Sequence, residues 1–141
     1  MGATGTARQF TFIQEANSVI TAPCPERPIL AKGFQEIRGL AWSGRGKIIR
    51  VDVSVDGGDN WQSAQLQEPV LSKALTRFRL PWNWNGEVAF LQARAIDESG
   101  YVQPTIEQLR AVRGVNSVYH KNSIHTWRVN ADGKVNNVQI L

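Results

Sequence analysis

The chain has 141 residues, the size of one ordinary domain. Hydrophobic residues make up 42% of it and charged residues 20%, which is typical of a folded chain and too apolar for a disordered one. No apolar run reaches the roughly 20 residues that a membrane helix needs. With one cysteine, Cys24, and two histidines, His120 and His125, the chain has no internal disulfide and no Cys-rich or His-rich metal centre. We therefore expect no membrane association and no complete enzyme.

The chain is basic, with 16 Lys and Arg against 12 Asp and Glu and a net charge of +4. Its basic residues are spread singly along the sequence, and no block of five or six occurs. This distribution argues against a nucleic-acid partner. A solvated sheet face, or a basic surface that meets an acidic partner, accounts for the charge instead.

The first part of the chain predicts a short irregular N-terminal segment followed by extended segments. Residues 1–8 are rich in Gly, Ala and Thr, so we expect a frayed end or a cloning remnant, and one domain from 9 to 141. Three prolines predict an extended loop over residues 22–33. The strands expected in this part cover residues 10–14, 18–21 and 34–43.

Alternation with a period of two dominates the middle of the chain. Ile49, Val51 and Val53 alternate with polar residues, which predicts a strand with one buried and one wet face. A tight turn is expected at residues 56–58, which read Asp-Gly-Gly. The strands expected from here on cover residues 61–66, 77–80 (stopped by Pro81), 88–96, 126–129 and 135–140, the last two flanking a turn at Asp132-Gly133.

These segments amount to seven to nine short strands, with turn signals every 8–12 residues. Only residues 105–112 have any helical character. Such spacing is typical of an all-β sandwich of two antiparallel sheets. The residues expected inside it are Val51, Val53, Phe78, Leu80, Leu91 and Ala93.

No motif for catalysis accompanies this pattern. His120 and His125 lie among serines, but no G-x-S-x-G elbow occurs. Residues 44–46, Gly-Arg-Gly, are too short for a dinucleotide loop. The lone Cys24, between Pro23 and Pro25, belongs to no motif typical of a reactive thiol. We therefore assign no catalytic residue and no metal ligand.

The five tryptophans are the unusual feature of the composition. Trp82 and Trp84 point to the same side of an extended segment and lie beside Asn83 and Asn85. Exposed aromatics next to amides can stack on sugars. A free-standing ligand-binding sandwich, for example a carbohydrate-binding module, is therefore one hypothesis.

A second hypothesis is self-association. Leu40 and Trp42 alternate out of phase with Ile37. In the later segment, Val88 and Phe90 alternate out of phase with Leu91 and Ala93. If all four lie on one outer sheet face, two copies can bury them by two-fold symmetry. The competing view places Trp42 in the core and Ile37 outside.

The residues also resemble a known family. The segments Gly-Leu-Ala-Trp-Ser-Gly at 39–44 and Val-Ser-Val-Asp-Gly-Gly at 53–58, followed by Trp61, are similar to the C-terminal dimerisation domain of sulfite-oxidase-type molybdenum-cofactor enzymes. The resemblance continues through residues 77–86, 94–104 and 113–120. Within the family, the segments at 8–12, 18–21 and 67–71 resemble the molybdenum subunit of Sox-system sulfane dehydrogenases.

The resemblance implies an immunoglobulin-like sandwich that pairs two subunits. It implies that molybdopterin and the molybdenum-ligating cysteine belong to a preceding catalytic domain that is absent here, so Cys24 inherits no role and this chain has no cofactor. The family's substrate-proximal Arg after Trp-His corresponds to Lys121 after Tyr119 and His120, which makes His120 and Lys121 candidate substrate-proximal residues. The implied partners are a second copy, the catalytic domain and a cytochrome c subunit, in a periplasmic parent enzyme.

Overall fold

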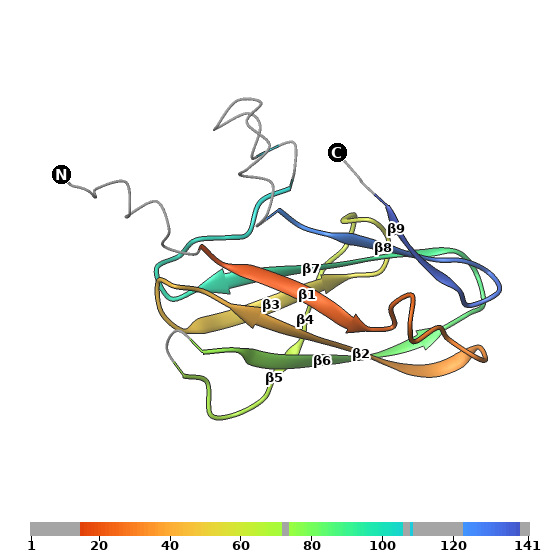
Figure 1. Ribbon diagram of the computed structural model, residues 1–141, viewed down its shortest axis with the longest axis horizontal. Coiled ribbons are helices and arrows are strands. Elements are labelled where there is room, and N and C mark those ends of the chain that lie inside the picture. Colours follow the sequence, from red (N-terminus) through yellow and green to blue (C-terminus); the bar gives the residue numbers. More distant parts are fainter. Residues whose placement is uncertain (1–14, 72–73, 106–107, 109–122, 139–141) are drawn as a thin grey trace.

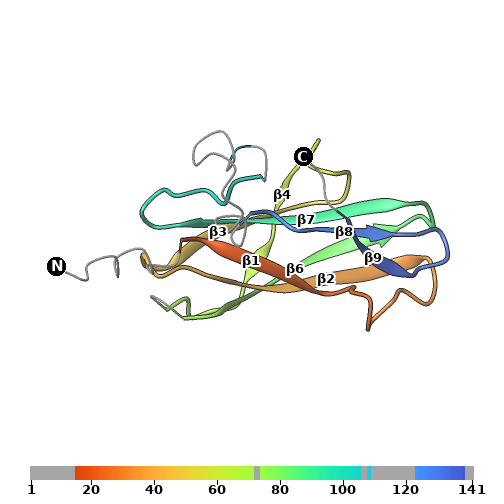
Figure 2. The ribbon, with the colours of Figure 1, turned by 45° about the horizontal axis from the view of Figure 1, so that its top comes forward.

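The computed structural model describes residues 15–71, 74–105, 108 and 123–138, which form two antiparallel sheets packed face to face (Figures 1 and 2). Within these residues no helix is long and apolar enough to cross a membrane. The strands are β1 (Asn17–Ala22), β2 (Gly33–Trp42), β3 (Ile48–Ser54), β4 (Gln62–Ser63), β5 (Gln65–Leu66), β6 (Thr76–Trp84), β7 (Ala89–Asp97), β8 (Thr126–Val129) and β9 (Val135–Val138).

One sheet has four strands in the order β1-β2-β6-β5, and the other has five in the order β4-β3-β7-β8-β9. Figure 2 shows the two layers, with β1, β2 and β6 in one and β3, β7 and β8 in the other. The predicted all-β sandwich is confirmed. The strand expected over residues 10–14, most of the helical stretch at 105–112 and residues 139–141 lie outside the described residues.

The core lies between the two sheets and uses one face of each. All six residues expected inside are buried, and Val51, Val53 and Leu91 are at most 1% exposed. The inner face of β2 also carries Gly39, where an added Cβ would overlap the ring of Phe78 on β6. Period-two alternation therefore identified these six inward-facing residues on β3, β6 and β7 correctly.

The strand expected over residues 61–66 is divided between the two sheets. β4 pairs with β3 in the five-stranded sheet, whereas β5 pairs with β6 in the four-stranded sheet. The chain crosses at the buried Ala64, whose N–H donates to the carbonyl of Val51 at 2.7 Å. This crossing links the two layers at an edge.

Pro81 does not stop its strand, contrary to the expectation. β6 continues to Trp84, and Pro81 pairs in register with Glu36 of β2. On its other side β6 pairs with β5 only at Phe78 and Arg79. A missing N–H on that side costs no ladder bond, because β5 has already ended.

The face of β3 expected to be wet is largely covered. Asp52 and Ser54 are 3% and 1% exposed. At the other end of the strand the register shifts between Ile48 and Arg50, so that Ile48 is buried and Ile49 is 56% exposed. A one-residue shift exchanges the two faces of a strand. Alternation alone therefore misplaced Ile49.

Buried polar side chains tie the two sheets together. Ser43, just after β2, donates to Oδ2 of Asp97 at the end of β7 at 2.7 Å, and Ser99 donates to Oδ1 from its backbone and its hydroxyl. Burial alone would raise the pKa of Asp97, but the hydrogen bonds from Ser99, Ser43 and the Tyr101 backbone outweigh it and hold the pKa below its ordinary value. Asp97 is therefore ionised at neutral pH, and its hydrogen bond with Ser43 holds the ends of β2 and β7 together.

Gln103 forms a second tie between the sheets. Its side chain is 1% exposed, and Oε1 accepts from Ser18 Oγ on β1 at 2.7 Å and from the Ala95 N–H on β7 at 3.2 Å. Its Nε2 donates to Asn17 and to the carbonyl of Ser123. A single buried amide thus satisfies groups from both sheets.

The hydrogen bonds to the ionised Asp97 predict that its replacement destabilises the domain in a pH-dependent way. Replacing Asp97 with Asn should lower the free energy of unfolding by about 2 kcal/mol at pH 7, because hydrogen bonds to a buried carboxylate are lost. A lowered pKa in the folded state gives stability that is full above the unfolded value of about 4 and disappears as the pH falls through the folded value. The deficit, measured by urea unfolding, should therefore shrink below pH 4. The exposed Asp59→Asn is the control, and a deficit independent of pH would contradict the account.

Two positions in β2 decide between the competing views of Trp42. Ile37 is fully buried and belongs to the core, whereas Trp42 is half-buried and lies on the outer phase of the strand. Placing Ile37 outside is therefore wrong. Ile37→Ala should cost about 2–5 kcal/mol, and Trp42→Ala about 1 kcal/mol. Urea unfolding of both variants measures the difference, and an equal or larger loss for Trp42→Ala would show that its ring supports the fold.

Candidate functional site

The four residues considered for self-association lie on opposite sides of the sandwich. Leu40 and Trp42 belong to the outer face of β2 in the four-stranded sheet. Phe90 belongs to the outer face of β7 in the five-stranded sheet, and Val88 precedes that strand in the same phase. The condition that all four share one outer face is therefore not met. Each pair marks a separate candidate surface.

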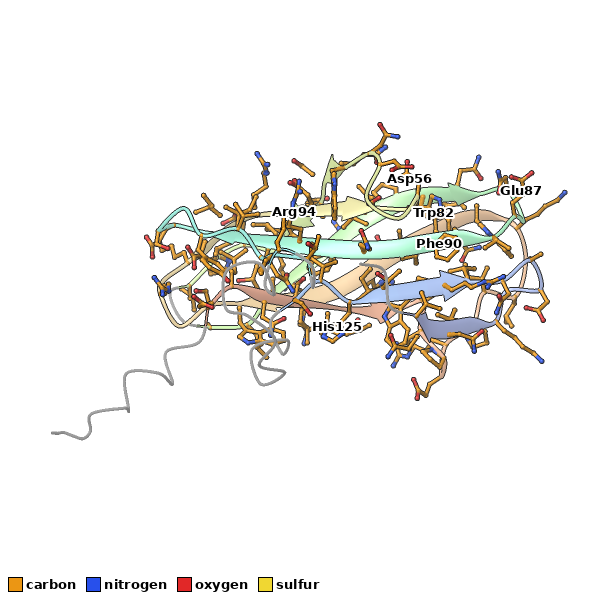
Figure 3. The ribbon with its side chains drawn as sticks, turned by 90° about the horizontal axis from the view of Figure 1, so that it is seen from above. Asp56, Trp82, Glu87, Phe90, Arg94 and His125 are labelled. Carbon is orange, nitrogen blue, oxygen red and sulfur yellow. The ribbon has the colours of Figure 1, made fainter. Side chains whose placement is uncertain are left out.

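The tryptophans considered for sugar stacking point inward. Trp84 is 4% exposed, and its Nε1 donates to the carbonyl of Glu87 at 2.8 Å. Trp82 is half-buried and packs against the core from the same face of β6 (Figure 3). Rings that fill a core cannot stack on a sugar, so this pair forms no carbohydrate platform.

The first candidate surface is the region around Phe90, which we call the Phe90 patch and define by Val88, Phe90 and Arg128. Val88 is 43% exposed and Phe90 is half-buried. Arg128 on β8 lies directly opposite Phe90, with its guanidinium 5.9 Å from the ring centroid. The patch is apolar with one cationic edge, and Figure 3 shows Phe90 on β7.

Farther along this sheet two arginines share one buried carboxylate. Asp52 accepts from Arg50 at 2.9 Å and from Arg94 at 3.0 Å, and the Arg94 guanidinium stacks 4.1 Å from the centroid of the Trp61 ring. The turn before Trp61 is held by Asp56, which accepts from Asn60. Side-chain and backbone hydrogen bonds from Asn60, followed by the hydroxyl of Ser54, lower the pKa of Asp56 to about 2. The two ion pairs of Asp52, together with the stacking of Arg94 on Trp61, explain why Asp52 is buried on a face that was expected to be exposed to solvent.

The second candidate surface is a groove on the outer face of the four-stranded sheet, with a volume of about 680 Å³. We call it the arginine groove. We define it by seven of its lining residues: Arg27, Arg38, Arg77, Arg79, Glu36, Glu68 and Leu40. In the sequence these arginines are spread singly and form no charged block. The usable signal was the alternation of Arg77 and Arg79 in one strand, but strand pairing was needed to bring Arg38 beside them.

The remaining sequence-level candidates form no site in the described part of the chain. His120 and Lys121 lie outside the described residues. The Cys24 thiol is half-buried and lies 3.5 Å from a carboxylate oxygen of Glu26. No group of three or more His, Cys, Asp and Glu side chains suited to a metal ion occurs among the residues described.

Comparisons with known proteins agree with this architecture. The model of the Mo-co oxidoreductase dimerisation domain family matches residues 8–127. Mouse sulfite oxidase (Mus musculus) is 38% identical over 114 residues, covering 74% of this chain and 20% of the relative. Spinach nitrate reductase (Spinacia oleracea) is 39% identical over 102 residues, covering 62% of this chain and 11% of the relative. The chain thus spans a fifth or less of these two relatives.

A solved structure extends the comparison to three dimensions. The crystal structure of the sulfane dehydrogenase SoxCD from Paracoccus pantotrophus is 57% identical, with a TM-score of 0.87, and the match covers 91% of this chain and 33% of that chain. The fold is therefore the immunoglobulin-like sandwich expected from the resemblance. Sequence and structure together establish that the chain belongs to the Mo-co oxidoreductase dimerisation domain family.

Proposed function

We propose that this chain is an assembly domain, not catalytic by itself, that pairs two copies through the Phe90 patch. The observation that carries the proposal is the apolar pair Val88 and Phe90, which lies outside the core on an outer sheet face, in a chain whose family is defined by dimerisation. A stable two-fold interface buries about 1,200–2,000 Å² in total, so the patch would form its centre and neighbouring polar residues its rim.

Charge favours the Phe90 patch over the pair Leu40 and Trp42. In a two-fold dimer each surface meets its own copy. The Phe90 patch carries one arginine, Arg128, against the four of the arginine groove, and Arg50 and Arg94 farther along its sheet share Asp52. On the four-stranded sheet, Leu40 lines the arginine groove, so self-pairing there would bring guanidinium groups together.

The relatives support a proposal about the enzyme in which this domain acts. We propose that the domain serves a molybdenum-cofactor oxidoreductase of the sulfite oxidase family, with sulfite or sulfane sulfur as substrate. Molybdopterin would be held by a catalytic domain, with a cytochrome c subunit as electron acceptor in the periplasm. In that enzyme His120 and Lys121 would lie near the anionic substrate, where Lys supplies charge without the bidentate fork of Arg.

The parent activity is testable on the complete protein that contains this domain. Bound molybdenum and sulfite- or thiosulfate-dependent reduction of cytochrome c should be found together. Lys121→Ala should raise the KM for the sulfur anion roughly tenfold, because a cation near the substrate is lost. Absence of molybdenum from the purified complete protein would contradict the proposal.

Self-association of this chain is testable by sedimentation equilibrium. We expect a dimer at micromolar concentration, and Val88→Ser with Phe90→Ser should raise its Kd at least tenfold, because buried aromatic anchors often contribute 2 kcal/mol or more, by an order-of-magnitude guide. Leu40→Ser with Trp42→Ser is the matched control and should change the Kd less than threefold. Circular dichroism checks the fold of each variant.

Two results would contradict this assignment. A wild-type chain that stays monomeric at high micromolar concentration would refute self-association of the domain alone. Loss of the dimer in the Leu40 and Trp42 variant, with the Val88 and Phe90 variant unchanged, would place the interface on the opposite sheet.

A further inference from the structure

The outer face of the four-stranded sheet carries positive charge that the fold does not neutralise. Arg38 of β2 and Arg79 of β6 are directly opposite each other in the register, and Arg77 lies two residues along the same face. Like charges directly opposite on neighbouring strands are destabilising. The fold therefore tolerates an arrangement that weakens its own sheet.

The acidic residues nearby are too few to balance these arginines. Glu36 pairs with Arg38 at 2.6 Å, and this pair is largely exposed, with 63% of the Arg38 side chain accessible. Among the residues described, Arg27, Arg77 and Arg79 make no ion pair. With Glu68 as the second carboxylate, the groove keeps an excess of two positive charges from four arginines and two glutamates.

The shape of the groove limits what can occupy it. Its volume of about 680 Å³ is many times that of one oxyanion. Arg27 comes from the loop after β1, Arg38 from β2 and the other two arginines from β6, so the four charges are spread over three segments of the chain. The half-buried Leu40 adds an apolar side chain to the lining. Such a surface fits an extended chain with several negative charges.

We propose that the arginine groove docks an extended acidic segment of a partner polypeptide other than a second copy of this chain. Guanidinium forks bind carboxylates with two parallel hydrogen bonds, which suits Asp and Glu side chains along a strand. A second copy is disfavoured because it would present the same excess of positive charge. This surface is distinct from the Phe90 patch, so a pair of copies would carry two such docking sites facing away from their interface.

The test uses a fluorescent ten-residue peptide of alternating Asp and Glu, with an Asn and Gln peptide as the uncharged control. Fluorescence anisotropy in 50 mM salt should show that the full chain binds the acidic peptide, with an affinity that falls as salt rises. Arg77→Glu with Arg79→Glu should weaken binding at least tenfold. Lys47→Glu with Lys134→Glu changes the net charge by the same amount at exposed positions outside both the arginine groove and the Phe90 patch, and it should weaken binding less than threefold.

Each remaining outcome overturns the proposal. Equal losses in the two double variants would show a net-charge effect. Displacement of the peptide by inorganic phosphate, but not by chloride of equal ionic strength, would indicate a small-anion site. Tighter binding to phosphatidylserine vesicles than to the peptide would indicate a lipid surface. If sedimentation shows that Arg77→Glu with Arg79→Glu dissociates the dimer, this face is the self-association interface. If the wild-type chain does not bind the acidic peptide, docking is refuted.

Discussion

The structure depends on buried polar side chains that reach between the two sheets. Asp97 accepts from Ser43 across the end of the sandwich, and the Gln103 amide joins Ser18 of β1 to Ala95 of β7. Apolar packing is non-directional, so a core of Val, Ile and Ala allows the sheets to slide relative to each other. Hydrogen bonds between specific atoms remove that freedom. They therefore fix the offset between the two sheets, while the alternation along each strand sets which side chains face in and which face out.

Fixed faces give the domain two outer surfaces of different chemistry. On the five-stranded sheet, Arg50 and Arg94 share Asp52, and the Phe90 patch carries one arginine beside its two apolar side chains. On the four-stranded sheet, Arg38 and Arg79 oppose each other without a matching pair of acids. An apolar patch can meet its own copy, whereas a basic groove repels it. One domain can thus hold two different neighbours without competition between them.

The sequence predicted the sandwich well because its signal is local. The alternation around Val51 and Leu91 identified the inner faces, and these are the faces that pack together. The prediction was wrong where the outcome depended on neighbouring strands. Pro81 stays in its strand because β5 ends before it, and residues 61–66 divide between sheets at Ala64. The arginine groove was not recognised as a site, because only strand register places Arg38 beside Arg79.

Hydroxyl-radical footprinting over a range of protein concentrations tests the assignment of the two faces most directly, because it reports side-chain exposure residue by residue. Phe90 and Phe34 are matched aromatic probes on the outer faces of the five-stranded and four-stranded sheets, and Phe34 is 72% exposed. Our account predicts that the oxidation rate of Phe90 falls as the chain associates, whereas that of Phe34 stays constant. Protection of Phe34 with Phe90 unchanged would contradict it.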